Sequence, residues 1–131
     1  MEHEFGCAAC YGEDVETAMD FVLKHARESD RVVDHSHFGV SVRVCPECGQ
    51  RFVMIFAEYV DWVHSEDPQY FDVVPVTENE AERVVAAGRG VSLDTLGKLG
   101  HGRRRMSSEW PSGEPKVISW RTGWFEVRPG D

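Results

Sequence analysis

The chain has 131 residues, of which 41% are hydrophobic and 28% charged, and its formal net charge is −9. This length suits one compact domain, and the hydrophobic fraction excludes a disordered chain while predicting a thin core that would gain stability from a staple such as a metal. The acidic balance disfavours broad nucleic-acid binding, because acidic surfaces repel phosphates.

Membrane insertion and secretion are not expected from this sequence. No apolar run approaches the ~20 residues that cross a bilayer, and the start, MEHEFGCAAC, lacks the basic and apolar segments of a signal peptide. We therefore expect a cytoplasmic protein. In a reducing cytosol, four cysteines in two pairs indicate metal or redox chemistry rather than disulfides.

The first half of the chain predicts one helix followed by strands. Apolar residues recur at helical spacing over about 13–28, which predicts a helix with one buried face. Residues 31–34 predict a short strand, and 38–44 alternate as a half-buried strand does. Residues 51–60 are apolar on both faces, which predicts a central strand that is covered on both sides.

A strand and a capped helix are predicted next. Residues 70–76 have strand character, and Pro75 predicts an edge strand because proline cannot donate a ladder hydrogen bond. Thr77 and Glu80 have the spacing of a capping box, which predicts that a helix begins there and runs over about 78–88.

The last third predicts less regular structure. Ser92 is a candidate cap for a short helix over about 93–99, and residues 100–115 predict an exposed, flexible loop. Residues 116–127 predict a terminal hairpin that turns at Gly123. Together these elements predict a single α+β domain with a small antiparallel sheet and two to three helices.

The cysteines form two pairs, Cys7 with Cys10 and Cys45 with Cys48. Two intervening residues let both sulfurs of a tight turn reach one ion, and a structural zinc ion takes four such ligands. In the stretch CPECG, the proline fixes the backbone after the first cysteine, and Gly49 permits a left-handed step after the second.

The stretch CPECGQRF, residues 45–52, resembles the second knuckle of zinc-ribbon proteins, where such a loop tips a β-hairpin and faces another CxxC knuckle. The first knuckle, CAACYG, matches less well because it lacks the proline. Since 34 residues separate the pairs, the resemblance implies an elaborated zinc ribbon. It also implies a structural Zn²⁺ ion with four ligands, Cys7, Cys10, Cys45 and Cys48.

A second, looser resemblance covers the segment from Cys45 to about Gln69. It is similar to small uncharacterised bacterial proteins that carry a CPxCGQxF knuckle and then an E-x-x-D-W segment, here Glu58, Asp61 and Trp62. This resemblance implies no activity.

Other interpretations of the cysteines stay open. CPEC also resembles the active loops of thioredoxin-like redox proteins, in which the loop opens a helix and thereby lowers the thiol pKa. Here Gly49 and a strand-like run follow instead. The four cysteines could also be unrelated buried residues.

Two further groups are candidate sites. The acidic residues Glu58, Asp61 and Asp67 could hold a cation, although a solvated loop is the simpler interpretation. Arginines and tryptophans gather near the C-terminus, and such groups are typical of interface hot spots and can stack on nucleic-acid bases. This candidate partner-binding group consists of Arg103, Arg104, Arg105, Trp110, Trp120 and Trp124.

No nucleophile, phosphate-loop or zinc-protease motif is present, and four cysteines would leave a zinc ion no open position for catalysis. We therefore expect a zinc-binding module that acts as a protein-binding or adaptor protein, and not an enzyme. The alternatives are a redox-active or redox-sensing dithiol protein, a nucleic-acid-binding zinc ribbon, and an acidic inhibitor of the immunity-protein type.

Overall fold

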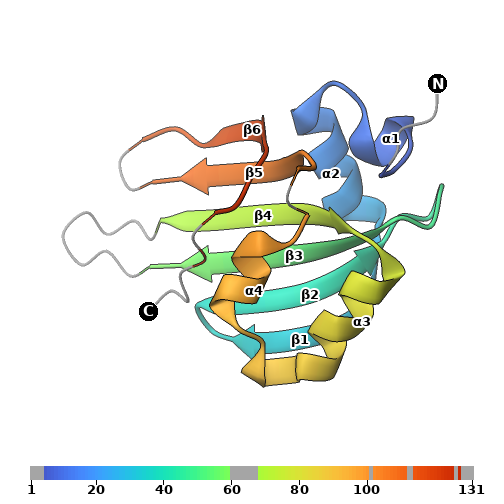
Figure 1. The fold of residues 1–131 in the computed structure, drawn as a ribbon. Helices are drawn as coiled ribbons and strands as arrows, with labels where there is room; N and C mark the ends of the chain where they lie inside the picture. Colours follow the sequence, from blue (N-terminus) through green and yellow to red (C-terminus); the bar gives the residue numbers. More distant parts are fainter. Residues whose placement is uncertain (1–4, 60–67, 101, 112–113, 126, 128–131) are drawn as a thin grey trace.

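The computed structural model describes residues 5–59, 68–100, 102–111, 114–125 and 127. They form an α+β fold, as predicted, in which helices lie on both faces of a six-stranded antiparallel sheet (Figure 1). The strands are β1 (Arg27–His35), β2 (Phe38–Val44), β3 (Arg51–Glu58), β4 (Gln69–Val76), β5 (Arg105–Trp110) and β6 (Val117–Arg121). The helices are α1 (Ala8–Tyr11), α2 (Val15–His25), α3 (Glu78–Ala87), the 3₁₀ helix η1 (Gly88–Gly90) and α4 (Leu93–Lys98).

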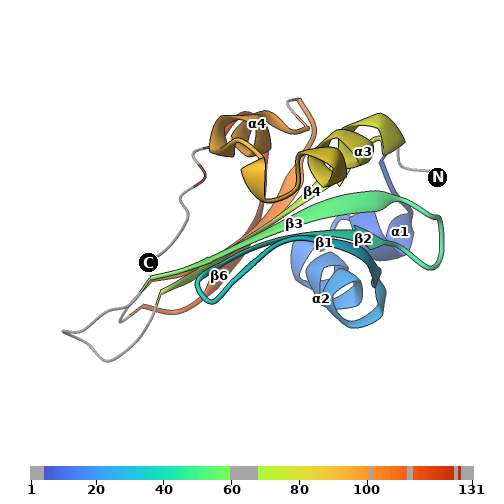
Figure 2. The same ribbon diagram turned by 90° about the horizontal axis from the view of Figure 1, so that it is seen from below.

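The sheet is a simple meander in the order β1-β2-β3-β4-β5-β6. Helices α1 and α2 lie on one face and α3 and α4 on the other, so the molecule has three layers (Figure 2). We call these the cysteine face and the α3/α4 face. No helix in the described part of the chain is long and apolar enough to cross a membrane.

Strand β3 lies near the middle of the sheet and is buried on both faces, as its continuous apolar pattern predicts. Phe52 and Met54 belong to the core of the cysteine face. Val53 and Ile55 belong to the core of the α3/α4 face. Alternation along one strand therefore supplies both cores.

The predicted first helix is present as α2, which buries Ala18, Met19 and Val22. It ends at His25, earlier than expected, because β1 already begins at Arg27. Strand β1 is longer than the predicted 31–34. Its first five residues are exposed, so no apolar alternation marks them in the sequence.

The prediction that residues 70–76 form an edge strand is wrong, because β4 pairs with both β3 and β5. The ladder with β5 covers only Gln69–Val73, so Pro75 lies beyond its end and needs no N–H on that side. The Pro75 carbonyl instead accepts a hydrogen bond from Arg103 Nη1 at 3.0 Å.

Both predicted helix caps are present. Thr77 Oγ1 accepts a hydrogen bond from the Glu80 N–H at 3.2 Å, and Glu80 Oε1 accepts one from the Thr77 N–H at 2.9 Å. Ser92 Oγ accepts from the Thr95 N–H at 3.3 Å, at the start of α4. These caps satisfy amide groups that have no partner within the helix.

The predicted loop over 100–115 is wrong in its middle, where β5 pairs with β4 on one side and β6 on the other. The stretch RMSSEW alternates weakly, because polar Ser107 and Ser108 are both buried in this strand. The sequence pattern of β5 therefore lacks the clear alternation of apolar and polar residues that marks an ordinary strand.

The predicted terminal hairpin is also wrong, because β6 pairs with β5 and not with any described residue after Gly123. The chain then crosses α4, where the Phe125 N–H donates to the Gly97 carbonyl at 3.0 Å. Gly97 makes this crossing possible, since a Cβ there would lie 2.1 Å from the Phe125 carbonyl oxygen. Val127 then joins the core of the α3/α4 face.

Candidate metal centre

The second knuckle forms the tip of the β2–β3 hairpin, as the zinc-ribbon resemblance implies. The Cys45 N–H donates to the Gln50 carbonyl at 2.9 Å, and the Gly49 N–H donates to the Cys45 carbonyl at 2.9 Å. Gly49 has φ 80°, the left-handed step expected after Cys48. The chain thus turns back within the knuckle and enters β3 at Arg51.

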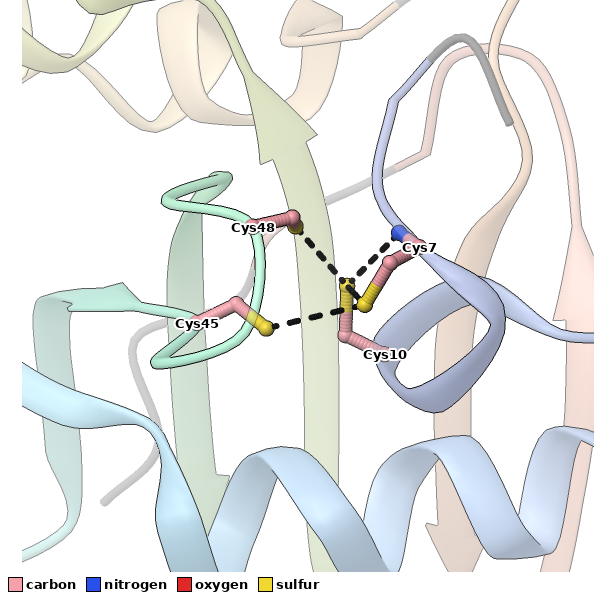
Figure 3. Close-up of side chains that lie close together, drawn as sticks. All are labelled: Cys7, Cys10, Cys45 and Cys48. Carbon is pink, nitrogen blue, oxygen red and sulfur yellow. Dashed lines mark hydrogen bonds between the residues drawn. The ribbon is translucent and has the colours of Figure 1, made fainter. Parts of the chain in front are cut away.

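The first knuckle is built on the short helix α1. Cys7 lies immediately before this helix and Cys10 lies within it. The Tyr11 N–H donates to the Cys7 carbonyl at 2.8 Å, and the Cys7 N–H donates to Cys10 Sγ at 3.3 Å. This single turn aims both sulfurs toward the hairpin tip (Figure 3).

The four sulfur atoms gather into one cluster, in which all lie within 4.8 Å of one another. Cys7 Sγ lies 3.7 Å from Cys10 Sγ and 3.9 Å from Cys45 Sγ, and Cys10 Sγ lies 3.8 Å from Cys48 Sγ (Figure 3). A tetrahedron with metal–sulfur bonds of about 2.3 Å has edges of about 3.8 Å. The cluster therefore fits a four-coordinate metal ion.

The surroundings of the cluster differ from one thiol to the next. Cys10 and Cys45 are buried, whereas Cys48 is exposed. Burial raises the pKa of Cys10 and of Cys48. Burial opposes ionisation of Cys7 as well, but hydrogen bonds from the backbone of Cys10 and Ala9 outweigh it and lower the pKa of Cys7. Four thiolates so close together need a cation to balance their charge.

Contacts from Arg104, which precedes β5, and from Trp120 in β6 hold the first knuckle in place. The Arg104 guanidinium lies over the rings of Tyr11 and Trp120, 4.3 and 4.1 Å from their centroids. Its Nη2 donates to the Tyr11 carbonyl, and the Tyr11 hydroxyl donates to the Arg104 carbonyl at 2.6 Å. Trp120 Nε1 donates to the Glu13 carbonyl at 3.0 Å. Arg104 and Trp120 are thus half-buried and make their contacts within the chain.

The three consecutive arginines do not form a patch. Arg103 lies over the Phe5 ring and donates to Glu80 Oε1 at 2.6 Å. Arg105 is buried on the α3/α4 face, where its Nε donates to Asp72 Oδ1 at 3.0 Å. The exposed loop predicted over 100–115 is therefore wrong for these arginines, because the chain direction and strand alternation send their side chains to different parts of the fold.

Two of the three candidate tryptophans are exposed. Trp110 is 49% exposed and Trp124 61%. A lysine lies over each ring, Lys116 over Trp110 and Lys98 over Trp124. Partner binding through these residues stays a prediction.

The predicted acidic cluster is only partly within the described residues. Glu58 is described, and it contacts His37 Nδ1 at 3.2 Å and accepts from Gln69 Nε2 at 2.9 Å. Asp61 and Asp67 lie outside the described residues. In the part of the chain that the structure describes, the four cysteines make the one group of His, Cys, Asp and Glu close enough to hold an ion.

Sequence reasoning missed a polar cavity on the α3/α4 face of β4, β5 and β6. Its charged lining residues are Asp72, Arg105, Glu109 and Arg121. The one signal in the sequence was Asp72, a charge inside the apolar run YFDVVPV. The other three charged residues lie in segments that were predicted otherwise, Arg105 and Glu109 in a loop and Arg121 in a hairpin.

Comparison with protein-family models, with curated proteins and with solved structures found no match for this chain.

Proposed function

We propose that this protein is a zinc-binding module whose Cys7, Cys10, Cys45 and Cys48 hold one structural Zn²⁺ ion. The observation that carries the proposal is the sulfur spacing of 3.7 to 3.9 Å, which is that of a tetrahedral thiolate site. A bound zinc ion supplies charge balance and a crosslink. All four positions are filled by protein ligands, which suits a structural role rather than catalysis.

The proposed crosslink joins α1 to the β2–β3 hairpin, and α1 would not be a stable helix by itself. Helix α1 has only four residues, far fewer than an isolated helix needs. Tethering it to the β2–β3 hairpin places Tyr11 in the core of the cysteine face. The residues that hold the ion therefore also complete that core.

Metal analysis of the purified chain tests the proposal. We expect about one zinc ion per chain. Cys10→Ser should lose the zinc, whereas Glu47→Gln, a change to an exposed side chain in the second knuckle that has no ligand role, should retain it. Stoichiometric iron in place of zinc, or unchanged zinc content in Cys10→Ser, would contradict the assignment.

A redox-active dithiol is the second candidate, and the lowered pKa of Cys7 favours it. Oxidation would join the sulfurs of Cys7 and Cys10 and pass two electrons and two protons to an added disulfide such as oxidised glutathione. Mass spectrometry of the chain as purified decides between the candidates. A reversible Cys7–Cys10 disulfide in chain that contains no metal would favour the redox role, and thiols that stay reduced beside a full zinc content would reject it.

The biological role that we propose is binding of another protein. Two apolar side chains on the cysteine face are exposed, Leu23 by 40% and Trp110 by 49%. Leu23 and Trp110 line a hollow of about 230 Å³ whose charged lining residues are Glu16, Asp20 and Lys116, so acidic groups outnumber basic ones. An apolar anchor flanked by basic groups is the partner chemistry that suits this surface.

Site-specific photocrosslinking tests this role. A crosslinker placed at Leu23 should give one defined adduct, and Trp110→Ala should abolish it. The same crosslinker at Val85, an exposed valine on α3, is the matched control and should give none. Equal adducts at both positions would mean non-specific contact and would contradict the proposal.

Nucleic-acid binding has less support than protein binding. Arg103, Arg104 and Arg105 are occupied by Glu80, by aromatic rings and by Asp72. No feature of the described residues favours the inhibitor hypothesis over the others.

A further inference from the structure

The α3/α4 face of the sheet changes character halfway across. Over β2 and β3 it is lined with apolar side chains such as Val40, Val42 and Val53. Over β4, β5 and β6 it carries charged and hydroxyl groups instead, and two of these, Arg105 and Ser107, are 7% and 4% exposed. Buried charge is costly and adds little stability over an apolar core of the same size. A polar interior at this place therefore suggests a binding role.

These polar groups line a cavity of about 500 Å³, within the range of about 300–1,000 Å³ that is typical of small-molecule sites. Its walls are partly apolar and aromatic. The apolar and aromatic lining residues are Ile55, Ala57, Tyr59, Pro68, Tyr70, Phe125 and Val127. An apolar wall with a few convergent polar groups is the usual composition of a ligand site.

The floor of the cavity is a fixed ion pair. Arg105 Nε lies 3.0 Å from Asp72 Oδ1, and the two side chains are 8% and 18% exposed. Arg105 also donates to the Gly123 carbonyl at 3.0 Å and lies over the Phe125 ring, while Ser107 hydrogen-bonds Asp72. Because these groups already pair with one another, they form the floor of the cavity, and a ligand need not break their contacts to bind.

The cavity also contains a looser ion pair. Arg121 Nη2 lies 3.3 Å from Glu109 Oε1, and both side chains are nearly half exposed. Exposed pairs of this kind are weak, so either partner can exchange for a group on a ligand. The four charges sum to zero, which disfavours phosphates and other strongly anionic ligands and matches a molecule with one charge of each sign.

One residue of the cavity wall has a buried hydroxyl without a hydrogen-bond partner in the described part of the chain. Tyr59 lines the cavity, and the Tyr59 hydroxyl is buried without a hydrogen-bond partner among the described residues. Its ring meets that of Tyr70 edge to face, with centroids 5.9 Å apart. Buried polar groups are ordinarily paired, so a hydroxyl on the cavity wall that is unpaired within the described ranges departs from ordinary core packing.

From this arrangement we propose that the cavity binds a small zwitterionic molecule with an apolar group, of the class of free α-amino acids. The ligand carboxylate pairs with Arg121 and its ammonium with Glu109. Its apolar group lies against Tyr70 and the aliphatic wall formed by Ile55 and Val127. The site is separate from the cysteine cluster, which lies on the other face of the sheet.

Calorimetric titration of the full chain with three probes tests the proposal. L-phenylalanine carries both charges, phenethylamine lacks the carboxylate, and 3-phenylpropionate lacks the ammonium. We expect phenylalanine to bind about tenfold more tightly than either of the others, because each of those loses one charge-assisted pair. No binding of phenylalanine, or equal affinity for the three probes, would overturn the proposal.

Three variants connect any binding to this cavity. Arg121→Gln and Glu109→Gln should each weaken phenylalanine binding about tenfold, and both positions are exposed enough to leave the fold intact, which circular dichroism checks. Lys24→Gln removes one partner of a more exposed ion pair on α2 and should change nothing. Binding that persists undiminished in the two cavity variants would place it elsewhere and reject the site.

Discussion

The two faces of the sheet are stabilised in different ways, although they share the same six strands. The cysteine face carries an assorted core of Phe, Met and Tyr residues, and its shortest helix is joined to the sheet through sulfur atoms. The α3/α4 face has a largely aliphatic core under two capped helices, beside a polar cavity. The cysteine face thus carries a cluster that could hold a metal crosslink, whereas local helix signals support the α3/α4 face.

The largest effect should come from removing the metal. With a chelator, we expect α1 and the second knuckle to lose amide-exchange protection while α3 retains it, because only the cysteine face depends on the crosslink. Structural zinc contributes about 10–16 kcal/mol in isolated zinc-finger peptides, and we expect a loss of several kcal/mol here. Hydrogen exchange followed by mass spectrometry measures this. Equal loss of protection on both faces would show that the faces are not independent.

The buried ion pair of the α3/α4 face should give the next largest effect. Arg105→Met leaves the Asp72 carboxylate buried without its partner and should lower the free energy of unfolding by about 3–5 kcal/mol. Burial already raises the pKa of Asp72, despite the hydrogen bonds from Arg105 and Ser107. The double variant Arg105→Met with Asp72→Leu is the control and should recover most of the loss. Urea unfolding compares the three proteins, and a double variant as unstable as Arg105→Met would contradict this account.

The crossing of the C-terminal segment over α4 should contribute a smaller amount. Gly97→Ala places a methyl group against the Phe125 carbonyl and should cost about 1–3 kcal/mol through overpacking. Gly90→Ala is the matched control, since a Cβ there meets no atom within 4 Å. Thermal unfolding measures both. Equal melting temperatures for the two variants would show that this crossing is not tight.

The smallest effect concerns Glu80, whose carboxylate joins the capping box of α3 to Arg103. Burial alone would raise the pKa of Glu80, but hydrogen bonds from Arg103 and Thr77 lower it. The carboxylate therefore adds stability above its ordinary pKa, and this contribution disappears as the pH falls through the lowered value. Urea unfolding at several pH values should show wild type and Glu80→Gln converging in acid. A constant difference between them would reject this linkage.

The predictable parts of the fold are those with local signals. Alternation in FGVSVRV gave β2 its bounds, and the spacing of Thr77 and Glu80 located the start of α3. The CPxCG knuckle placed Cys45 and Cys48 in one turn. Each of these signals spans a few residues, so it needs no knowledge of the partner strand or helix.

The parts that were mispredicted depend on contacts between distant segments. Strand β5 carries a buried arginine and two buried serines, which only pairing with β4 and β6 can accommodate. Pro75 indicated an edge strand, but the length of the neighbouring ladder decided otherwise. The cavity arose for the same reason, since Asp72 and Arg105 are distant in the sequence.

By itself, the sequence determined the strong local elements and the identity of four candidate ligands, because hydrophobic periodicity, capping and knuckle spacing act over short distances. The tertiary structure alone decided that the four sulfurs gather within 4.8 Å of one another. It also decided that the side chains of Arg103, Arg104 and Arg105 contact different parts of the fold. The same pairing of strands brings the charged residues of β4, β5 and β6 into one cavity. These outcomes follow from which strands pair and which way each side chain alternates, and no short stretch of sequence contains that information.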